Sequence, residues 1–152
     1  MSDLPISVVE DFIKLFKGDL LGTGSAREVY ELATDPTKVL KIEIAKCSFQ
    51  NANEWQIWQL VTGTKLEKYF APCSMISPCG TVLIMAKTEP LRSKNIVMPD
   101  IITDLKIENF GMLKGKPVCH DYGISLHRMM YFATKRNKVR DIKFKKGDGY
   151  TR

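Results

Sequence analysis

The stretch that decides the fold runs from Met98 to Gly123 and reads MPDIITDLKIENFGMLKGKPVCHDYG. Its polar residues recur at intervals that packing does not explain. Lys106 follows Asp104 by two positions, Asn109 follows Asp104 by five, and a second aspartate, Asp121, stands in an Asp-Tyr-Gly. Intervals of this kind indicate that these side chains serve a chemical role.

Two short strands are predicted between the two aspartates. Residues 110–113 and 117–120 are apolar runs joined by Lys-Gly-Lys, the sequence of a tight hairpin turn. Such a hairpin folds the chain back on itself, so we expect Asp121 to lie beside Asn109. Two metal ligands and a base then converge on one point.

This arrangement resembles the catalytic apparatus of protein kinases, whose catalytic loop D-x-K-x-x-N precedes a metal-binding turn D-[FY]-G. Residues 104–109 (DLKIEN) match the loop and residues 121–123 (DYG) match the turn. The spacing D-x-x-x-x-N alone is also produced by an aspartate cap and a turn asparagine. The resemblance therefore depends on the segments upstream.

A glycine-rich segment, LLGTGSAREVY (20–30), has the outline G-x-G-x-x-G-x-V, with Arg27 where the third glycine usually stands. Without Cβ atoms at Gly22 and Gly24, a hairpin backbone can approach phosphate oxygens and donate N–H groups to them. A β-turn that contains two glycines is the alternative. The resemblance implies that Gly22 and Gly24 contact nucleotide phosphates and that Val29 covers the adenine.

The segment KVLKIEI (38–44) alternates as a strand, which puts Val39 and Lys41 on one face. A lysine on an apolar face costs desolvation unless it meets an anion. Glu54 is the only acid in the helix predicted for residues 51–60. The resemblance implies that Lys41 binds phosphates and that Glu54 orients it, although each charge taken singly also fits a solvated surface residue.

The two predicted helices have different assignments. Residues 8–17 follow a capping box and form an amphipathic helix that we interpret as packing, with no functional role. In the helix 51–60, Trp55 and Trp58 are expected to face the core.

The segment from Met85 to Pro90 lies where a kinase has its gatekeeper and hinge, so the resemblance implies that Met85 and Val39 help to enclose the adenine. It follows two strands predicted around Ser77–Gly80. Five elements therefore recur in the order of the family: glycine loop, strand lysine, helix acid, catalytic loop and metal aspartate.

The departures from the family define the expected fold class. Only 14 residues separate Glu89 from Asp104, too few for the two helices that normally lie between hinge and catalytic loop. We therefore expect an α+β fold, a kinase-like N-lobe of twisted antiparallel sheet plus one helix, with a strongly reduced C-lobe. The motifs occupy residues 19–123 of a single domain, 1–127. The outline is similar to that of the minimal kinase-like proteins of tailed bacteriophages.

Composition sets the remaining expectations. The chain has 152 residues, of which 44% are hydrophobic, which suits one domain with a core. Residues 128–152 hold nine Lys/Arg against two Asp, a net +7, while residues 1–127 carry −1. We expect a basic C-terminal helix or tail whose residues 135–146 bind nucleic acid or an acidic protein, or are a solvated terminus.

Hydropathy predicts no membrane partner, because no run approaches the roughly 20 apolar residues of a membrane span and no export signal is visible. We expect a cytoplasmic protein, in the host cytoplasm if phage-encoded. The four cysteines show no paired spacing, which favours reduced thiols.

Three function classes follow. The resemblance implies an ATP- and Mg²⁺-dependent phosphotransferase acting on a protein or small-molecule hydroxyl: Asp104 is the base, Lys106 steadies the γ-phosphate, and Asn109 and Asp121 hold Mg²⁺. The alternative is a kinase-like nucleotide-binding module that inhibits or modulates a partner protein or nucleic-acid complex without phosphoryl transfer. The third is a nucleic-acid anchor based on the tail. The filled motif positions favour the enzyme, whereas the missing substrate lobe favours the module.

Overall fold

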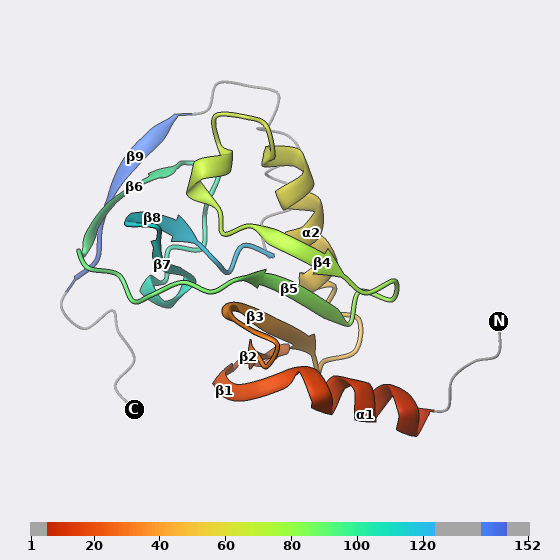
Figure 1. Ribbon diagram of the computed structural model, residues 1–152. Coiled ribbons are helices and arrows are strands. Elements are labelled where there is room, and N and C mark those ends of the chain that lie inside the picture. The colour runs from red at the N-terminus through yellow and green to blue at the C-terminus, as the bar shows by residue number, and fades with distance from the viewer. Residues whose placement is uncertain (1–5, 124–137, 146–152) are drawn as a thin grey trace.

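The structure, a computed structural model, describes residues 6–123 and 138–145 (Figure 1). Its elements in chain order are α1 (Ile6–Phe16), β1 (Lys17–Thr23), β2 (Arg27–Leu32), β3 (Asp35–Glu43), α2 (Gln50–Val61), the 3₁₀ turn η1 (Glu67–Tyr69), β4 (Cys73–Ile76), β5 (Val82–Ala86), β6 (Asn95–Pro99), the 3₁₀ turn η2 (Ile107–Asn109), β7 (Phe110–Leu113), β8 (Lys116–Cys119) and β9 (Val139–Lys143).

The main sheet has five strands in the order β1-β2-β3-β5-β4, and each neighbouring pair is antiparallel. The helix α2 follows the third strand, as the sequence predicts. The α+β class and the antiparallel sheet with one helix on it are therefore confirmed, and this arrangement is compatible with a kinase-like N-lobe. Two further two-stranded sheets, β6-β9 and β7-β8, lie beside it (Figure 1).

The two faces of the main sheet have different neighbours. Alternation along β3 points Val39 toward the main core, which contains Ile57 of α2, and points Leu40 toward a smaller cluster that Ile13 of α1 packs against. The helix α1 thus touches the outer face of the sheet through Ile13, and the packing role expected for residues 8–17 rests on this contact. Its bounds, Ile6–Phe16, begin and end slightly earlier than predicted.

The helix α2 buries a face that differs from the expected one. Its buried residues are Asn51, Glu54, Ile57 and Val61, whereas Trp55 and Trp58 are only partly buried. The tryptophans pack at the edge of the core, and a polar pair, Asn51 and Glu54, takes the interior positions. The expected contact of Glu54 with Lys41 already requires an interior carboxylate, and Val61 is the third residue expected to bury the helix, so the difference is that the tryptophans lie at the edge of the buried face.

The predicted hairpin is confirmed. Strands β7 and β8 pair in the register Phe110 to Cys119, and the turn holds Lys114 and Gly115 at φ 49° and 76°. Positive φ at both central residues is the requirement of the type I′ turn that suits a two-residue hairpin. As expected, the hairpin returns the chain so that the backbone N–H groups of His120 and Asp121 donate to the carbonyl of Asn109, at 2.8 and 3.3 Å.

The C-terminal segment differs from the helix or tail expected for residues 128–152. Of this range the structure describes 138–145, which form β9 against β6. Ile142 and Phe144 are buried, and the Phe144 ring lies 5.7 Å from that of Phe110. The apolar residues between the basic ones alternate and fill the core, so this segment belongs to the domain. The remainder of the tail lies outside the described residues.

Among the described residues, no helix has the length and apolar character needed to cross a membrane.

Candidate functional site

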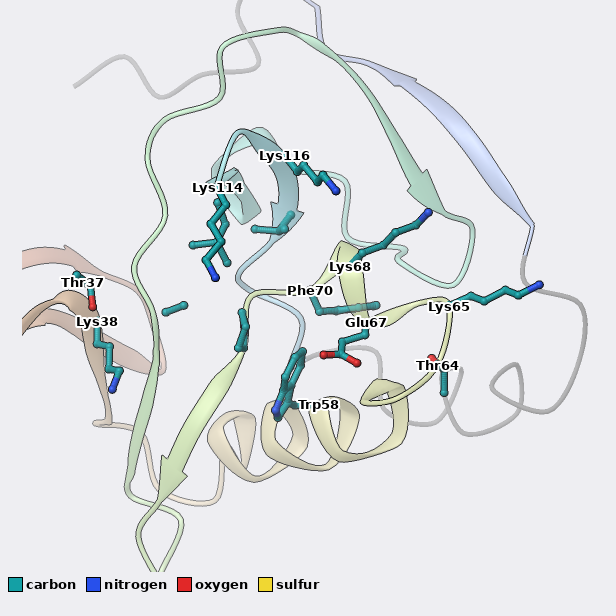
Figure 2. A pocket seen from close by; sticks show the side chains of 14 residues that line it. Thr37, Lys38, Trp58, Thr64, Lys65, Glu67, Lys68, Phe70, Lys114 and Lys116 are labelled. Atoms are coloured by element: carbon teal, nitrogen blue, oxygen red, sulfur yellow. The ribbon is translucent and has the colours of Figure 1, made fainter.

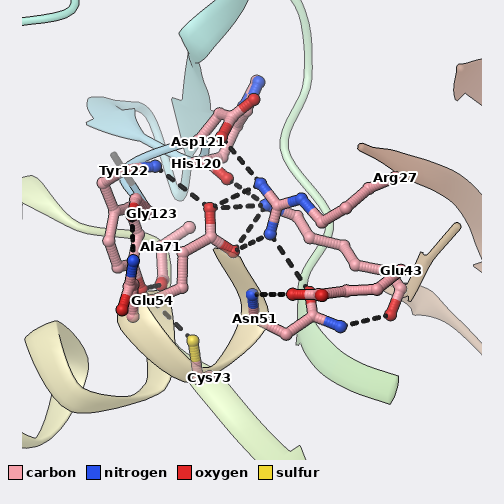
Figure 3. Close-up of polar contacts among 12 residues, drawn as sticks. Arg27, Glu43, Asn51, Glu54, Ala71, Cys73, His120, Asp121, Tyr122 and Gly123 are labelled. Atoms are coloured by element: carbon pink, nitrogen blue, oxygen red, sulfur yellow. Dashed lines mark hydrogen bonds and ion pairs between the residues drawn. The ribbon is translucent and has the colours of Figure 1, made fainter. Parts of the chain in front are cut away.

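The predicted pair of Lys41 and Glu54 is in contact, and the Glu54 carboxylate lies within a network of polar contacts that includes Arg27 and Tyr122 (Figure 3). The Lys41 ammonium lies 3.0 and 3.2 Å from the two carboxylate oxygens of Glu54, and both side chains are almost fully buried. Lys41 also donates to the backbone carbonyl of His120, next to Asp121. The strand lysine, the helix acid and the turn with the second aspartate therefore meet at one point.

A second cation, Arg27, shares the Glu54 carboxylate. Its guanidinium donates to both carboxylate oxygens, at 2.8 and 3.0 Å, in a bidentate arrangement. Burial raises the pKa of Glu54, but the attraction of Lys41 and Arg27 outweighs burial and lowers this pKa to about 2. Burial lowers the pKa of Arg27, yet its attraction to Glu54 outweighs that and raises the net value. The carboxylate is held ionised with no exposed surface.

Arg27 also contacts the predicted metal ligand. Its Nη2 lies 2.7 Å from Oδ1 of Asp121, and its Nη1 donates to Oδ1 of Asn51 at 3.1 Å. Asn51 in turn donates to the carbonyls of Lys41 and Thr81. Two cations and two carboxylates thus form one cluster of balanced charge.

The Asp-Tyr-Gly turn is docked on α2. The Tyr122 N–H donates to Oε1 of Glu54 at 3.0 Å, and the Tyr122 hydroxyl donates to the carbonyl of Ala71 at 2.8 Å. Gly123 lies so close to the helix that an added Cβ would stand 2.7 Å from the carbonyl oxygen of Gln50. The glycine of the motif is therefore required here for close packing on the helix.

The loop that carries Asp104 is tied to the same region. The side-chain amide of Asn109 donates to the backbone carbonyl of Asp104 at 3.1 Å, so its amide oxygen is the atom left to bind a cation. The Lys106 ammonium lies 3.9 Å from the Asp104 carboxylate, and its side chain is 66% exposed. The Asp104 side chain is 25% exposed, so Lys106 is the more accessible of the two.

The His120 side chain holds the segment that precedes the Asp-Tyr-Gly turn. Its Nε2 faces the carbonyl of Glu108 and its Nδ1 faces the hydroxyl of Thr88, each at 2.7 Å. A carbonyl only accepts, so Nε2 carries the proton and Nδ1 accepts from Thr88. Burial and the neighbouring Lys41 lower the pKa of His120 to about 4, so the ring is neutral at pH 7.

The glycine segment forms the β1–β2 hairpin. An added Cβ at Gly22 would meet nothing within 4 Å, and the Gly24 N–H donates to the carbonyl of Arg27 at 2.8 Å. Of the residues expected around adenine, Val29 is half-buried, whereas Val39 and Met85 are buried in the main core. The backbone at Gly22 is therefore open, whereas Val39 and Met85 offer almost no exposed surface for contact with a ligand.

The donors present fit a magnesium ion that is shared with a nucleotide. No group of three or more His, Cys, Asp or Glu capable of holding a metal occurs in the part of the chain that the structure describes. Asp121 and Asn109 offer one carboxylate and one amide oxygen, and Mg²⁺ is commonly held by one or two protein carboxylates together with substrate phosphates. The Asp121 side chain is 42% exposed, which leaves it accessible to such a ligand.

Sequence reasoning missed Arg27, Asn51 and His120 as members of this site. The signal for Arg27 was present in the alternation of β2, because Arg27 precedes Val29 by two residues and Val29 pairs with Lys41. Asn51 and His120 have no such signal, since their partners, Arg27 and the carbonyls of Lys41 and Thr81 for Asn51, and Thr88 and the Glu108 carbonyl for His120, are set by tertiary packing.

Comparison with known proteins gives a partial match to a solved structure. No protein-family model and no curated protein matches the sequence. Among solved structures, the chain is similar to the ternary complex of streptomycin, ATP and APH(2″)-IIa, an aminoglycoside phosphotransferase of kinase-like fold, with a TM-score of 0.43 and 17% identity. The match covers 64% of this chain and 32% of that one, so this chain spans about a third of its length. A match with this TM-score and identity carries no conclusion about the fold, the site residues or the activity of this chain.

Proposed function

We propose that the chain binds ATP with Mg²⁺ at the cluster of Lys41, Glu54 and Asp121 and transfers the γ-phosphoryl group to a hydroxyl. The observation that carries the proposal is the buried Lys41–Glu54 pair, with the Tyr122 N–H at 3.0 Å from Glu54. Burying this pair costs several kcal/mol per ion before compensation. A purely structural core would be built more simply from apolar side chains.

Each residue of the site has a role in this proposal. Lys41, held by Glu54, binds the α- and β-phosphates, and the backbone at Gly22 and Gly24 covers them. Asp121 and the amide oxygen of Asn109 hold the magnesium ion, which when bound neutralises charge on the phosphates.

The transfer step uses Asp104 and Lys106. An acceptor oxygen bonds to the γ-phosphorus while the bond from that phosphorus to the bridging oxygen of ADP breaks. Asp104 accepts the proton of the acceptor hydroxyl, and Lys106 steadies the γ-phosphoryl oxygens. The acceptor is a host protein or a small molecule, in the host cytoplasm if the chain is phage-encoded. Exposed residues of β9 and its flanks, Lys138, Lys143 and Lys145, are the part of the basic segment proposed to contact nucleic acid or an acidic protein.

A second candidate function is a nucleotide-binding module that controls a partner without phosphoryl transfer. The contact that favours it is the 2.7 Å ion pair between Arg27 and Asp121. An arginine that already neutralises Asp121 competes with a metal ion for the same oxygen. Nucleotide would then bind with little metal, and Asp104 would have no proton to accept.

Two matched variants separate the candidates. With radiolabelled ATP, Mg²⁺ and protein or small-molecule acceptors, Asp104→Asn is expected to leave ATP affinity intact and to cut transfer by about 10²–10⁴-fold. Asp121→Asn is expected to weaken both together. Transfer by Asp104→Asn at the wild-type rate would remove the assigned base, and ATP binding with no transfer to any acceptor would favour the module.

A further inference from the structure

A hollow of about 810 Å³ lies between the C-terminal end of α2, the β7–β8 turn and the start of β3 (Figure 2). It shares no lining residue with the candidate site, because Lys41, Glu54, Asp104 and Asp121 all lie elsewhere. Its floor is apolar and is made by Trp58, Phe70, Pro72, Ala86, Leu113 and Val118. Neither the phosphoryl-transfer proposal nor its alternative uses this surface.

The rim of the hollow is basic. Five lysines come from three separate segments of the chain and surround the apolar floor, as Figure 2 shows: Lys38, Lys65, Lys68, Lys114 and Lys116. The single acid on the lining, Glu67, accepts the Gly63 N–H at 2.7 Å and is thereby committed to the turn after α2. We refer to this hollow as the lysine-rimmed pocket.

Most of these lysines lack an internal counter-ion. Lys38 pairs with Asp35 at 3.3 Å. Within residues 6–123 and 138–145, no carboxylate lies within ion-pair distance of Lys65, Lys68, Lys114 or Lys116. Like charges gathered around one hollow repel one another, so the arrangement is favoured when an anion from outside enters it.

The concentration of charge here is local. Residues 1–127 carry a net charge of −1, yet the pocket gathers five lysines and one glutamate from that range. A nucleic acid could place phosphates on the rim and stack a base on Trp58, but Phe70 is 1% exposed and the other partly exposed floor residues, Pro72, Ala86 and Leu113, are aliphatic. A peptide fits both parts, because carboxylates can reach the rim while an aliphatic side chain covers Trp58 and its aliphatic neighbours.

We propose that the lysine-rimmed pocket docks an acidic segment of another protein, with an apolar side chain on the floor and flanking carboxylates against the lysines. The site is separate from the phosphoryl-transfer centre, so a partner can be held while nucleotide is bound. Binding is expected to weaken as ionic strength rises, because exposed charge pairs are screened by salt.

The test uses fluorescence anisotropy with a labelled peptide of about ten residues, two central leucines flanked on both sides by glutamates. Two twin peptides replace the glutamates with glutamines or the leucines with serines, and a single-stranded oligonucleotide serves as the competing class. Protein variants reverse charge on opposite sides of the rim, Lys65→Glu/Lys68→Glu and Lys114→Glu/Lys116→Glu. The matched control, Lys46→Glu/Lys94→Glu, changes the same charge outside the pocket.

We expect the acidic peptide to bind the wild type, and both twin peptides to bind it more weakly. Each rim variant should weaken the affinity for the acidic peptide by about tenfold or more, and the control variant should change this affinity by less than about twofold. Trp58→Phe should also remove a peptide-induced change in tryptophan fluorescence that Trp55→Phe retains. The proposal is overturned if the acidic peptide does not bind, if the glutamine twin binds equally well, if both rim variants match the control, or if the oligonucleotide binds more tightly than the peptide.

Discussion

Replacing Arg27 with glutamine removes the cation that Asp121 contacts and leaves the size of the side chain similar. If Asp121 is a metal ligand, a metal ion must compete with the guanidinium 2.7 Å from Oδ1. Unit charges about 4 Å apart attract by roughly 1 kcal/mol in water and roughly 4 kcal/mol at an effective dielectric constant of 20. The Asp121 side chain is 42% exposed, which places its pair between these limits.

We take about 2 kcal/mol for this pair, which corresponds to roughly 30-fold in metal affinity. Arg27→Gln is therefore expected to bind Mn²⁺ or Mg²⁺ about 30-fold more tightly, measured by calorimetry on protein saturated with a non-hydrolysable ATP analogue. Arg27→Lys, which keeps the cation, and Arg92→Gln, which removes an exposed one, should bind metal as the wild type does.

The same substitution is expected to lower stability while it raises metal affinity, and this combination distinguishes competition at Asp121 from a general loss of structure. Glu54 loses its bidentate partner and keeps Lys41 and the Tyr122 N–H, and breaking a buried ion pair costs about 3–5 kcal/mol. Arg27→Gln should therefore unfold at a lower urea concentration while gaining metal affinity. Metal affinity equal to or weaker than that of the wild type would refute the competition between Arg27 and metal at Asp121.

Three further predictions concern the framework of the site. Gly123→Ala should destabilise the protein by about 1–3 kcal/mol in urea unfolding, because its Cβ would stand 2.7 Å from the Gln50 carbonyl oxygen, whereas Gly22→Ala should change stability by less than about 0.5 kcal/mol; equal effects would contradict the docking of the turn. Phe144→Ala should cost about 3–5 kcal/mol if β9 belongs to the core, and a negligible cost would make this segment a tail. Lowering the pH from about 6.5 to about 4 should remove up to about 3 kcal/mol of unfolding free energy through His120, because its depressed pKa in the folded protein means that the unfolded chain takes up the proton first. The variant His120→Asn should lack this part of the dependence of stability on pH. The same pH dependence in His120→Asn and in the wild type would contradict a neutral ring in the folded protein.

The sequence predicts the fold where local patterns decide it. Alternation in residues 38–44 and the Lys-Gly turn between β7 and β8 are short-range signals, and the structure bears out both. The strand β9 was missed because its basic residues dominate its composition, while its core contacts come from Ile142 and Phe144 through pairing with a strand some forty residues earlier.

Only the contacts between residues of the recognised motifs could be predicted for the site. The Lys41–Glu54 contact followed from the motif order, and the place of Asp121 beside Asn109 followed from the hairpin. The capture of both carboxylates by Arg27 did not follow, because a substitution in a glycine motif shows only that the loop differs. The contact of Arg27 with Asp121 depends on how the strand, the helix and the Asp-Tyr-Gly turn pack together, and a local sequence pattern does not show this packing.

The claim that Lys41, Glu54 and Asp121 form a nucleotide site is tested most directly by calorimetric titration of Mg·ATP into the wild type, Asp121→Asn and a matched control, Asp141→Asn, whose carboxylate lies on exposed β9. Wild type and Asp141→Asn should bind with equal affinity, and Asp121→Asn should bind about 10- to 100-fold more weakly in the presence of Mg²⁺. No binding by the folded wild type, or equal binding by all three proteins, would contradict the assignment.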